Sequence, residues 1–127
     1  MKILSSKMHG ILDYLFILFV LAAPTIFGLE GALSTITYIL GVVHLLVTLL
    51  TDFELGVIKL IPFRVHGLLE VVVTVVLAIL AFWFYNNGYE TGFYLYMALA
   101  IVVMIVFILT DFKTVPQRKR GQDQPGD

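Results

Sequence analysis

The sequence HGILD at residues 9–13 recurs, with conservative changes, as HGLLE at residues 66–70. Each copy places a histidine and a carboxylate four residues apart, and each is followed by a long apolar run. A second apolar run follows in both places and ends in the same four letters, LTDF, at residues 50–53 and again at residues 109–112. The chain is therefore built twice on one pattern, and this pattern determines the fold that we predict.

The composition is that of a membrane protein. Apolar residues make up 60% of the 127 residues and charged residues only 13%, and the mean hydropathy is +0.99. Soluble domains contain about 45–50% apolar and about 25% charged residues, so the chain lies far outside that class. The absence of cysteine excludes disulfides, thiolate metal sites and iron–sulfur clusters. The basic run at residues 118–120 is too short to support nucleic-acid binding.

Four apolar runs are long enough to cross a bilayer, which takes about 20 residues. They cover residues 11–29, 32–51, 67–85 and 92–110. Backbone groups in lipid must be paired within the segment, so we predict an all-α membrane protein with four transmembrane helices. Turn signals at residues 29–31 and 86–90 join these helices into two antiparallel hairpins. Residues 1–115 then form one four-helix domain, and residues 116–127 form a disordered polar tail.

The basic residues predict the orientation. All eight lysines and arginines lie near the N-terminus, in the central connection or in the C-terminal tail, whereas the hairpin turns carry Glu30 and Glu90. The positive-inside rule then places both termini and the central connection in the cytoplasm. Both copies of the pattern, residues 8–57 and residues 65–115, enter the membrane from the same side. We therefore expect two parallel repeats related by a pseudo-two-fold axis along the membrane normal.

A family resemblance rests on four stretches that occur in a fixed order. They are HGILDY at residues 9–14, LLTDFELG at 49–56, KLIPFRVHG at 59–67 and LTDF at 109–112. In this order the chain, over residues 8–112, resembles the SPW-repeat integral membrane proteins of bacteria. The Ser-Pro-Trp signature is degenerate, with Ala-Pro-Thr at residues 23–25 and Ala-Phe-Trp at 81–83. The resemblance implies a small multi-pass protein of the bacterial cytoplasmic (inner) membrane, and it assigns no catalytic residue.

Seven ionisable side chains in or beside the predicted helices are candidate metal ligands. They are His9, Asp13, His44, Asp52, His66, Glu70 and Asp111. Histidine and carboxylate are ligands that zinc, iron and manganese accept, and residues four apart share a helix face. A structural interpretation competes with this one. Asp52 and Asp111 lie at the negative C-terminal ends of helices, where histidines from neighbouring helices would offset their charge and clasp one hairpin to the other.

His44 belongs to a feature that only one repeat carries. A stripe of small and polar residues, which includes Thr37, Gly41 and Thr48, follows one face of the second span and should face the bundle interior. At about 1.5 Å per residue, His44 lies roughly 12 Å deeper than Asp52. The second repeat has Val103 at the corresponding position. This asymmetry makes His44 the residue most suggestive of function.

We favour a non-enzymatic binding or assembly module over an enzyme, with no catalytic residue. The alternative is a metal-binding or proton-coupled membrane protein that uses the histidine and carboxylate residues named above. The sequence requires no cofactor, and a divalent metal ion is compatible with it. The expected partners are the lipid bilayer and either a second copy of the chain or another membrane protein. Whether the cluster is a clasp or a metal site stays open at this stage.

Overall fold

The computed structural model of the chain describes residues 2–113. This part contains four α-helices, all of them long and apolar enough to cross a membrane. They are α1 (Ser6–Ile26), α2 (Gly31–Leu49), α3 (Phe63–Asn86) and α4 (Glu90–Leu109). The prediction of an all-α chain with the helices of a multi-pass membrane protein is thereby confirmed. The predicted polar tail, residues 116–127, lies outside the described residues.

The first helix of each hairpin begins earlier than the apolar runs predicted. α1 begins at Ser6 rather than at residue 11, because the Ser5 hydroxyl accepts a hydrogen bond from the backbone N–H of Met8 at 3.2 Å and caps the helix. α3 begins at Phe63, directly after Pro62, whose ring fixes a backbone angle suited to a helix start. Both repeated histidines therefore lie inside helices, where the helix geometry sets their direction.

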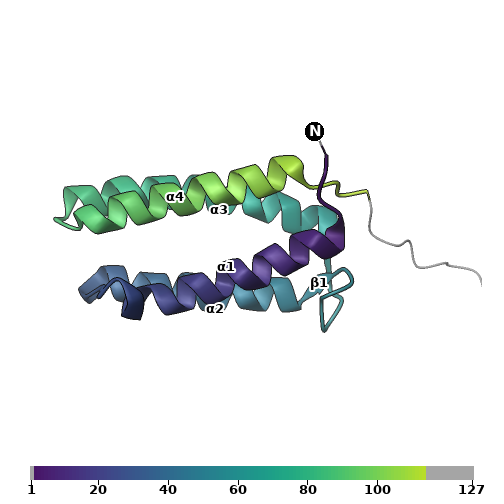
Figure 1. Cartoon of the computed structure of the whole chain (residues 1–127), viewed down its shortest axis with the longest axis horizontal. Coiled ribbons are helices and arrows are strands. Elements are labelled where there is room, and N and C mark those ends of the chain that lie inside the picture. Colours follow the sequence, from purple (N-terminus) through teal and green to yellow (C-terminus); the bar gives the residue numbers. More distant parts are fainter. Residues whose placement is uncertain (1, 114–127) are drawn as a thin grey trace, which may run out of the picture.

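The helices form two antiparallel hairpins, α1 with α2 and α3 with α4 (Figure 1). The turns that close the hairpins pass through Gly28 and Gly88, at positive φ of 59° and 84°. Glycine adopts this conformation without the steric cost that a side chain would bring. In Figure 1 the hairpins come together at the end that carries the N-terminus, and they lie farther apart at the end that carries the two turns.

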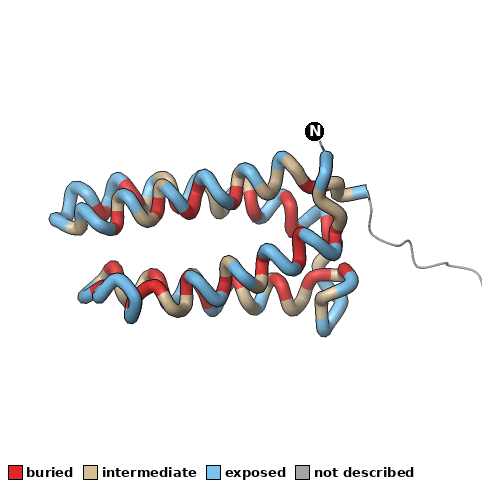
Figure 2. Tube along the Cα trace, in the orientation of Figure 1, coloured by how far each residue is buried: buried red, intermediate tan, exposed pale blue. Residues whose placement is uncertain are grey.

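Each helix buries one face and leaves the other exposed (Figure 2). The buried apolar residues of the hairpins include Val20, Leu77 and Phe84, which are fully buried. The exposed faces are also apolar, as Leu18 (65% exposed) and Ile79 (62%) illustrate. A broad apolar surface of this kind suits contact with lipid.

Short backbone pairings join the two hairpins at the end where they meet. β1 (Thr51–Asp52), which follows α2, pairs in parallel with β2 (Ile61–Pro62), which precedes α3. A parallel bridge likewise pairs Leu4, ahead of α1, with Thr110, directly after α4. The end of each hairpin is thus held against the start of the other. These pairings fix the position of Thr51 and Thr110, which both contact the site described next.

Candidate metal centre

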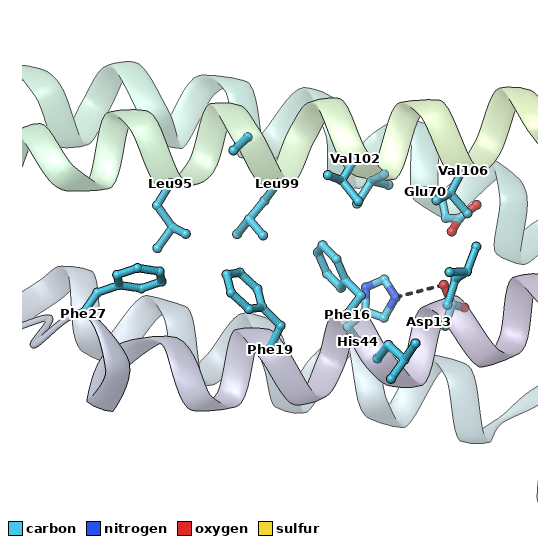
Figure 3. A pocket seen from close by; sticks show the side chains of 14 residues that line it. Asp13, Phe16, Phe19, Phe27, His44, Glu70, Leu95, Leu99, Val102 and Val106 are labelled. Atoms are coloured by element: carbon cyan, nitrogen blue, oxygen red, sulfur yellow. Dashed lines mark ion pairs between the residues drawn. The ribbon is translucent and has the colours of Figure 1, made fainter.

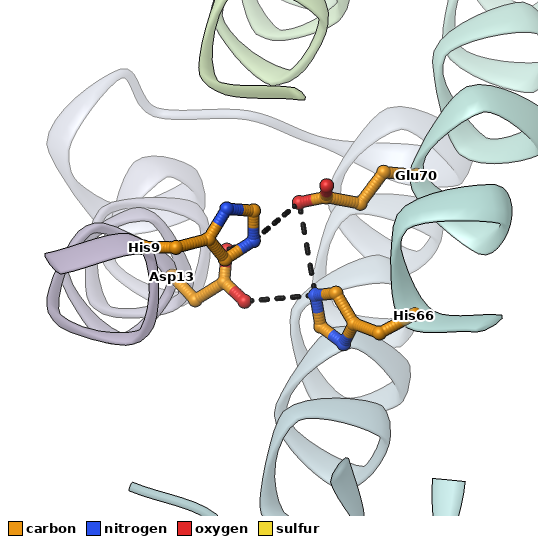
Figure 4. A group of neighbouring side chains, drawn as sticks. All are labelled: His9, Asp13, His66 and Glu70. Carbon is orange, nitrogen blue, oxygen red and sulfur yellow. Dashed lines mark ion pairs between the residues drawn. The ribbon is translucent and has the colours of Figure 1, made fainter. Parts of the chain in front are cut away.

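Four buried side chains from α1 and α3 converge between the hairpins (Figure 4). They are His9 and Asp13 from α1, and His66 and Glu70 from α3, each at most 4% exposed. One potential ligand atom from each residue lies within 4.8 Å of those of the other three. Each pair shares a helix face, as the spacing predicted. The spacing did not predict that the two pairs would meet. They form one cluster because α1 packs near α3.

The shortest contacts in the cluster run between the hairpins. The Nε2 atom of His9 lies 3.0 Å from Glu70 Oε1, and that of His66 lies 3.0 Å from Asp13 Oδ2. The contacts within each helix are longer, 3.4 Å in α1 and 3.7 Å in α3. Neither Nε2 atom has a hydrogen-bond partner within residues 2–113. Both 3.0 Å contacts are within hydrogen-bond distance, so a hydrogen bond across either one depends on whether Nε2 carries a hydrogen.

The other ring nitrogen of each histidine is held by a threonine from the opposite hairpin. His9 Nδ1 lies 2.7 Å from Thr110 Oγ1, and His66 Nδ1 lies 2.8 Å from Thr51 Oγ1. Each threonine hydroxyl donates its one hydrogen to the backbone carbonyl four residues earlier, at 2.6 Å for Thr110 and 2.7 Å for Thr51. The threonine oxygen therefore accepts from the histidine, and Nδ1 carries a hydrogen. In both rings it is Nε2 that faces the carboxylates.

This arrangement restricts the charge state of the centre. When both imidazoles are neutral, their Nε2 lone pairs and the carboxylate oxygens converge as acceptors with no hydrogen between them. Buried polar atoms without a partner are costly, and buried charges more so. Two added protons would convert the histidines to imidazolium and balance the two carboxylates. One divalent cation would supply the same charge and would bind the same four groups.

The distances suit a transition-metal ion with four ligands. Bonds of about 2.0–2.1 Å in a tetrahedral site place the ligand atoms about 3.3–3.4 Å apart. The nitrogen–oxygen contacts of the centre, between 3.0 and 3.7 Å, fall on both sides of this value, with Asp13 facing His9 through Oδ1 and His66 through Oδ2. One ligand atom from each of the four residues lies within 4.8 Å of the others, so binding an ion would draw the side chains closer together. Two histidines and two carboxylates are ligands that zinc, iron and manganese accept. Metal-binding histidines characteristically donate their second N–H to an oxygen, as His9 and His66 do here.

His44 lies beside the centre rather than within it. Its Nε2 atom is 3.7 Å from Asp13 Oδ1, and its ring packs against Phe16 with the centroids 5.1 Å apart (Figure 3). It is 8% exposed, and its Nε2 has no hydrogen-bond partner in the part of the chain that the structure describes. The sequence placed His44 in the bundle interior, and the structure puts it in contact with the cluster through Asp13.

Asp52 and Asp111, the other two candidate ligands, do not belong to the group of four. Asp52 is half-buried in β1, and the Asp111 carboxylate accepts the backbone N–H of Lys113 at 2.9 Å. The threonines that precede them, Thr51 and Thr110, contact the histidines instead. Successive side chains of an extended backbone point to opposite sides, so the chain cannot direct both residues at one histidine. Sequence reasoning missed the threonines, although the repeated LTDF stretch contains them.

Aromatic rings enclose the centre on the side of the connecting segments. Phe63 contacts both histidine rings, with centroids 5.3 Å from His9 and 6.0 Å from His66. The glycine after each histidine makes room for such a ring. A Cβ at Gly10 would overlap the ring of Phe53, and one at Gly67 would lie 2.6 Å from the ring of Phe112. The centre is therefore shielded from water, which strengthens electrostatic interactions within it.

Comparison of the chain with protein-family models, with curated proteins and with solved structures gives no match. The resemblance to SPW-repeat proteins stays a prediction from the sequence.

Proposed function

We propose that this protein is a non-enzymatic membrane module that binds one divalent transition-metal ion between its two hairpins. The ligands are His9, Asp13, His66 and Glu70. The observation that carries the proposal is the pair of histidine–threonine bonds, which direct both Nε2 atoms toward two carboxylates without forming hydrogen bonds to them. A metal ion satisfies all four groups at once and ties α1 to α3.

The proposed architecture has a pseudo-two-fold axis along the membrane normal that passes through the centre. Recurring contacts support it. The bond from His9 to Thr110 has its counterpart in the bond from His66 to Thr51, and two contacts of 3.0 Å cross between the hairpins. The backbone pairings ahead of α1 and α3 correspond in the same way. Under this symmetry each repeat supplies half of the metal site.

The proposed location is a bacterial inner membrane, with both termini and the connection between α2 and α3 in the cytoplasm. Every lysine and arginine lies in these segments, and cytoplasmic loops carry this excess of positive charge. The centre then lies near the cytoplasmic ends of the helices.

A metal-free assembly role is the second candidate. Two imidazolium rings would balance two carboxylates, and the shortest contacts, at 3.0 Å, join different hairpins. The cluster would then act as a clasp that selects one packing of the hairpins. Buried ion pairs of this kind contribute little net stability, but removal of one partner costs about 3–5 kcal/mol.

Metal analysis separates the two candidates. The protein is purified without a polyhistidine tag, incubated with Zn²⁺, Fe²⁺ or Mn²⁺ in turn, and desalted before elemental mass spectrometry. We expect about one ion per chain, in line with a site of four protein ligands. Retention should fall as the pH is lowered, because protons compete with the metal for the histidine nitrogens and carboxylates.

Two variants test whether metal retention depends on the proposed ligands. His66→Gln should lose the ion, because the amide side chain is a poor substitute for imidazole. Thr37→Val is the matched control, since it breaks the buried 2.8 Å hydrogen bond between Thr37 and Tyr96, away from the centre. It should lower stability by about 1–3 kcal/mol and retain the metal. Wild-type protein that stays free of all three metals would refute metal binding and leave the clasp.

A further inference from the structure

An apolar cavity of about 530 Å³ lies between the hairpins and ends at the candidate metal centre (Figure 3). Leucine, phenylalanine and valine side chains of α1 and α4 form most of its walls. Asp13, His44 and Glu70 line it at one end. Its volume falls within the range of small-molecule sites, about 300–1,000 Å³, and such sites occur between the helices of bundles.

The cavity opens sideways, toward the space that lipid would occupy. Leu15, Phe19 and Val102 line it and are nevertheless 58%, 41% and 47% exposed. The walls continue along α1 beyond Phe19, as far as Phe27 in the turn. At 1.5 Å per residue, the distance from Asp13 to the end of α1 is about 20 Å. This shape suits one long hydrocarbon chain that enters from the bilayer.

The polar end of the cavity contains buried polar atoms that lack a hydrogen-bond partner within the described residues. Glu70 Oε2 and His44 Nε2 are buried and make no hydrogen bond within the described residues. Glu70 contacts both histidines of the centre through its other oxygen, Oε1, so these contacts leave Oε2 without a partner. An occupant that donates a hydrogen bond would satisfy it. The carboxylates of Asp13 and Glu70 disfavour an anionic head group at the same place.

We propose that this cavity binds an uncharged amphiphile with a single hydrocarbon chain and a terminal hydroxyl group. The chain lies between α1 and α4, and the hydroxyl donates a hydrogen bond to Glu70 Oε2. The binding site is distinct from the four ligand atoms of the metal centre and requires no metal ion. A phospholipid or a fatty acid fits less well, because its charged phosphate or carboxylate would approach the two carboxylates.

Photolabelling in phosphatidylcholine nanodiscs tests this proposal. The probe is hexadecanol with a diazirine in its chain, and the labelled residues are identified by mass spectrometry. We expect labelling on cavity residues of α1 and α4. Unlabelled hexadecanol should compete about tenfold better than hexadecane, since a hydrogen bond to a charged acceptor supplies a difference of that order. Palmitic acid should compete less well than hexadecanol.

Ala98→Phe is the test variant, because Ala98 lines the cavity and is exposed, so that the larger side chain narrows the cavity without disturbing the core. Ile101→Phe, on the same helix at an exposed position outside the cavity, is its control. We expect labelling to be lost in the first variant and kept in the second, with metal content and melting temperature unchanged in both. Equal competition by hexadecane, better competition by palmitic acid, or unchanged labelling of Ala98→Phe would overturn the proposal.

Discussion

The two hairpins supply matching contacts to the centre but differ in the second helix of each. α2 buries Thr37, His44 and Thr48, whereas the buried positions of α4 include Leu99 and Val103. At the shared end, both hairpins contribute a histidine, a carboxylate and a threonine to one cluster. The matching contacts at the shared end explain how the hairpins are joined. The difference between α2 and α4 gives the cluster one polar neighbour, His44 from α2, and gives the cavity beside it an apolar wall from α4.

The largest expected effect is the loss of a carboxylate. Asp13→Ala should lower the free energy of unfolding by about 3–5 kcal/mol, because the charged or metal-bound histidines lose a buried partner. Glu70→Ala should do the same to a smaller extent. Asp13 contacts three histidines, at 3.0, 3.4 and 3.7 Å, whereas Glu70 contacts two, at 3.0 and 3.7 Å.

Dodecyl-sulfate titration in mixed micelles measures these unfolding free energies for both variants. Leu18→Ala, on the exposed face of α1, controls for the effect of any alanine in the apolar helices. A larger loss for Glu70→Ala than for Asp13→Ala would show that the contacts of His44 with Asp13 contribute nothing to the centre.

A second pair of changes compares the threonines. Thr51→Val and Thr110→Val each remove the acceptor for a buried Nδ1–H and should cost about 1–3 kcal/mol. If the centre holds a metal ion, each should also weaken its affinity by about 10–100-fold, because the ring is no longer held in place. Equal effects are expected, since the two bonds are 2.8 and 2.7 Å long.

Competition with a chelator of known affinity measures the change in metal binding, and thermal unfolding measures stability. Thr35→Val, at an exposed position where the hydroxyl donates to the backbone carbonyl of Gly31 in its own helix, is the control. A strong effect for one threonine and none for the other would contradict the proposed equivalence of the repeats.

The sequence was sufficient to predict the helices and the two histidine–carboxylate pairs. Apolar runs of sufficient length define the spans, and a spacing of four residues places His9 with Asp13 and His66 with Glu70 on one face. The meeting of these pairs was not predictable from spacing, because it depends on how α1 packs near α3. The choice of Thr51 rather than Asp52 as the partner of His66 depends on the extended backbone after α2.

The smallest effect is expected where the repeats differ. His44→Val introduces the residue that α4 carries at the corresponding position, Val103, and removes the 3.7 Å contact with Asp13 together with the ring contact with Phe16. We expect a stability change of about 1 kcal/mol, typical of a single substitution, and an unchanged metal content, because the four ligands do not include His44. Elemental analysis and thermal unfolding of this variant check both expectations. If the His44→Val variant loses the metal ion while the Thr37→Val variant retains it, His44 is a ligand. The first hairpin would then supply more ligands to the centre than the second.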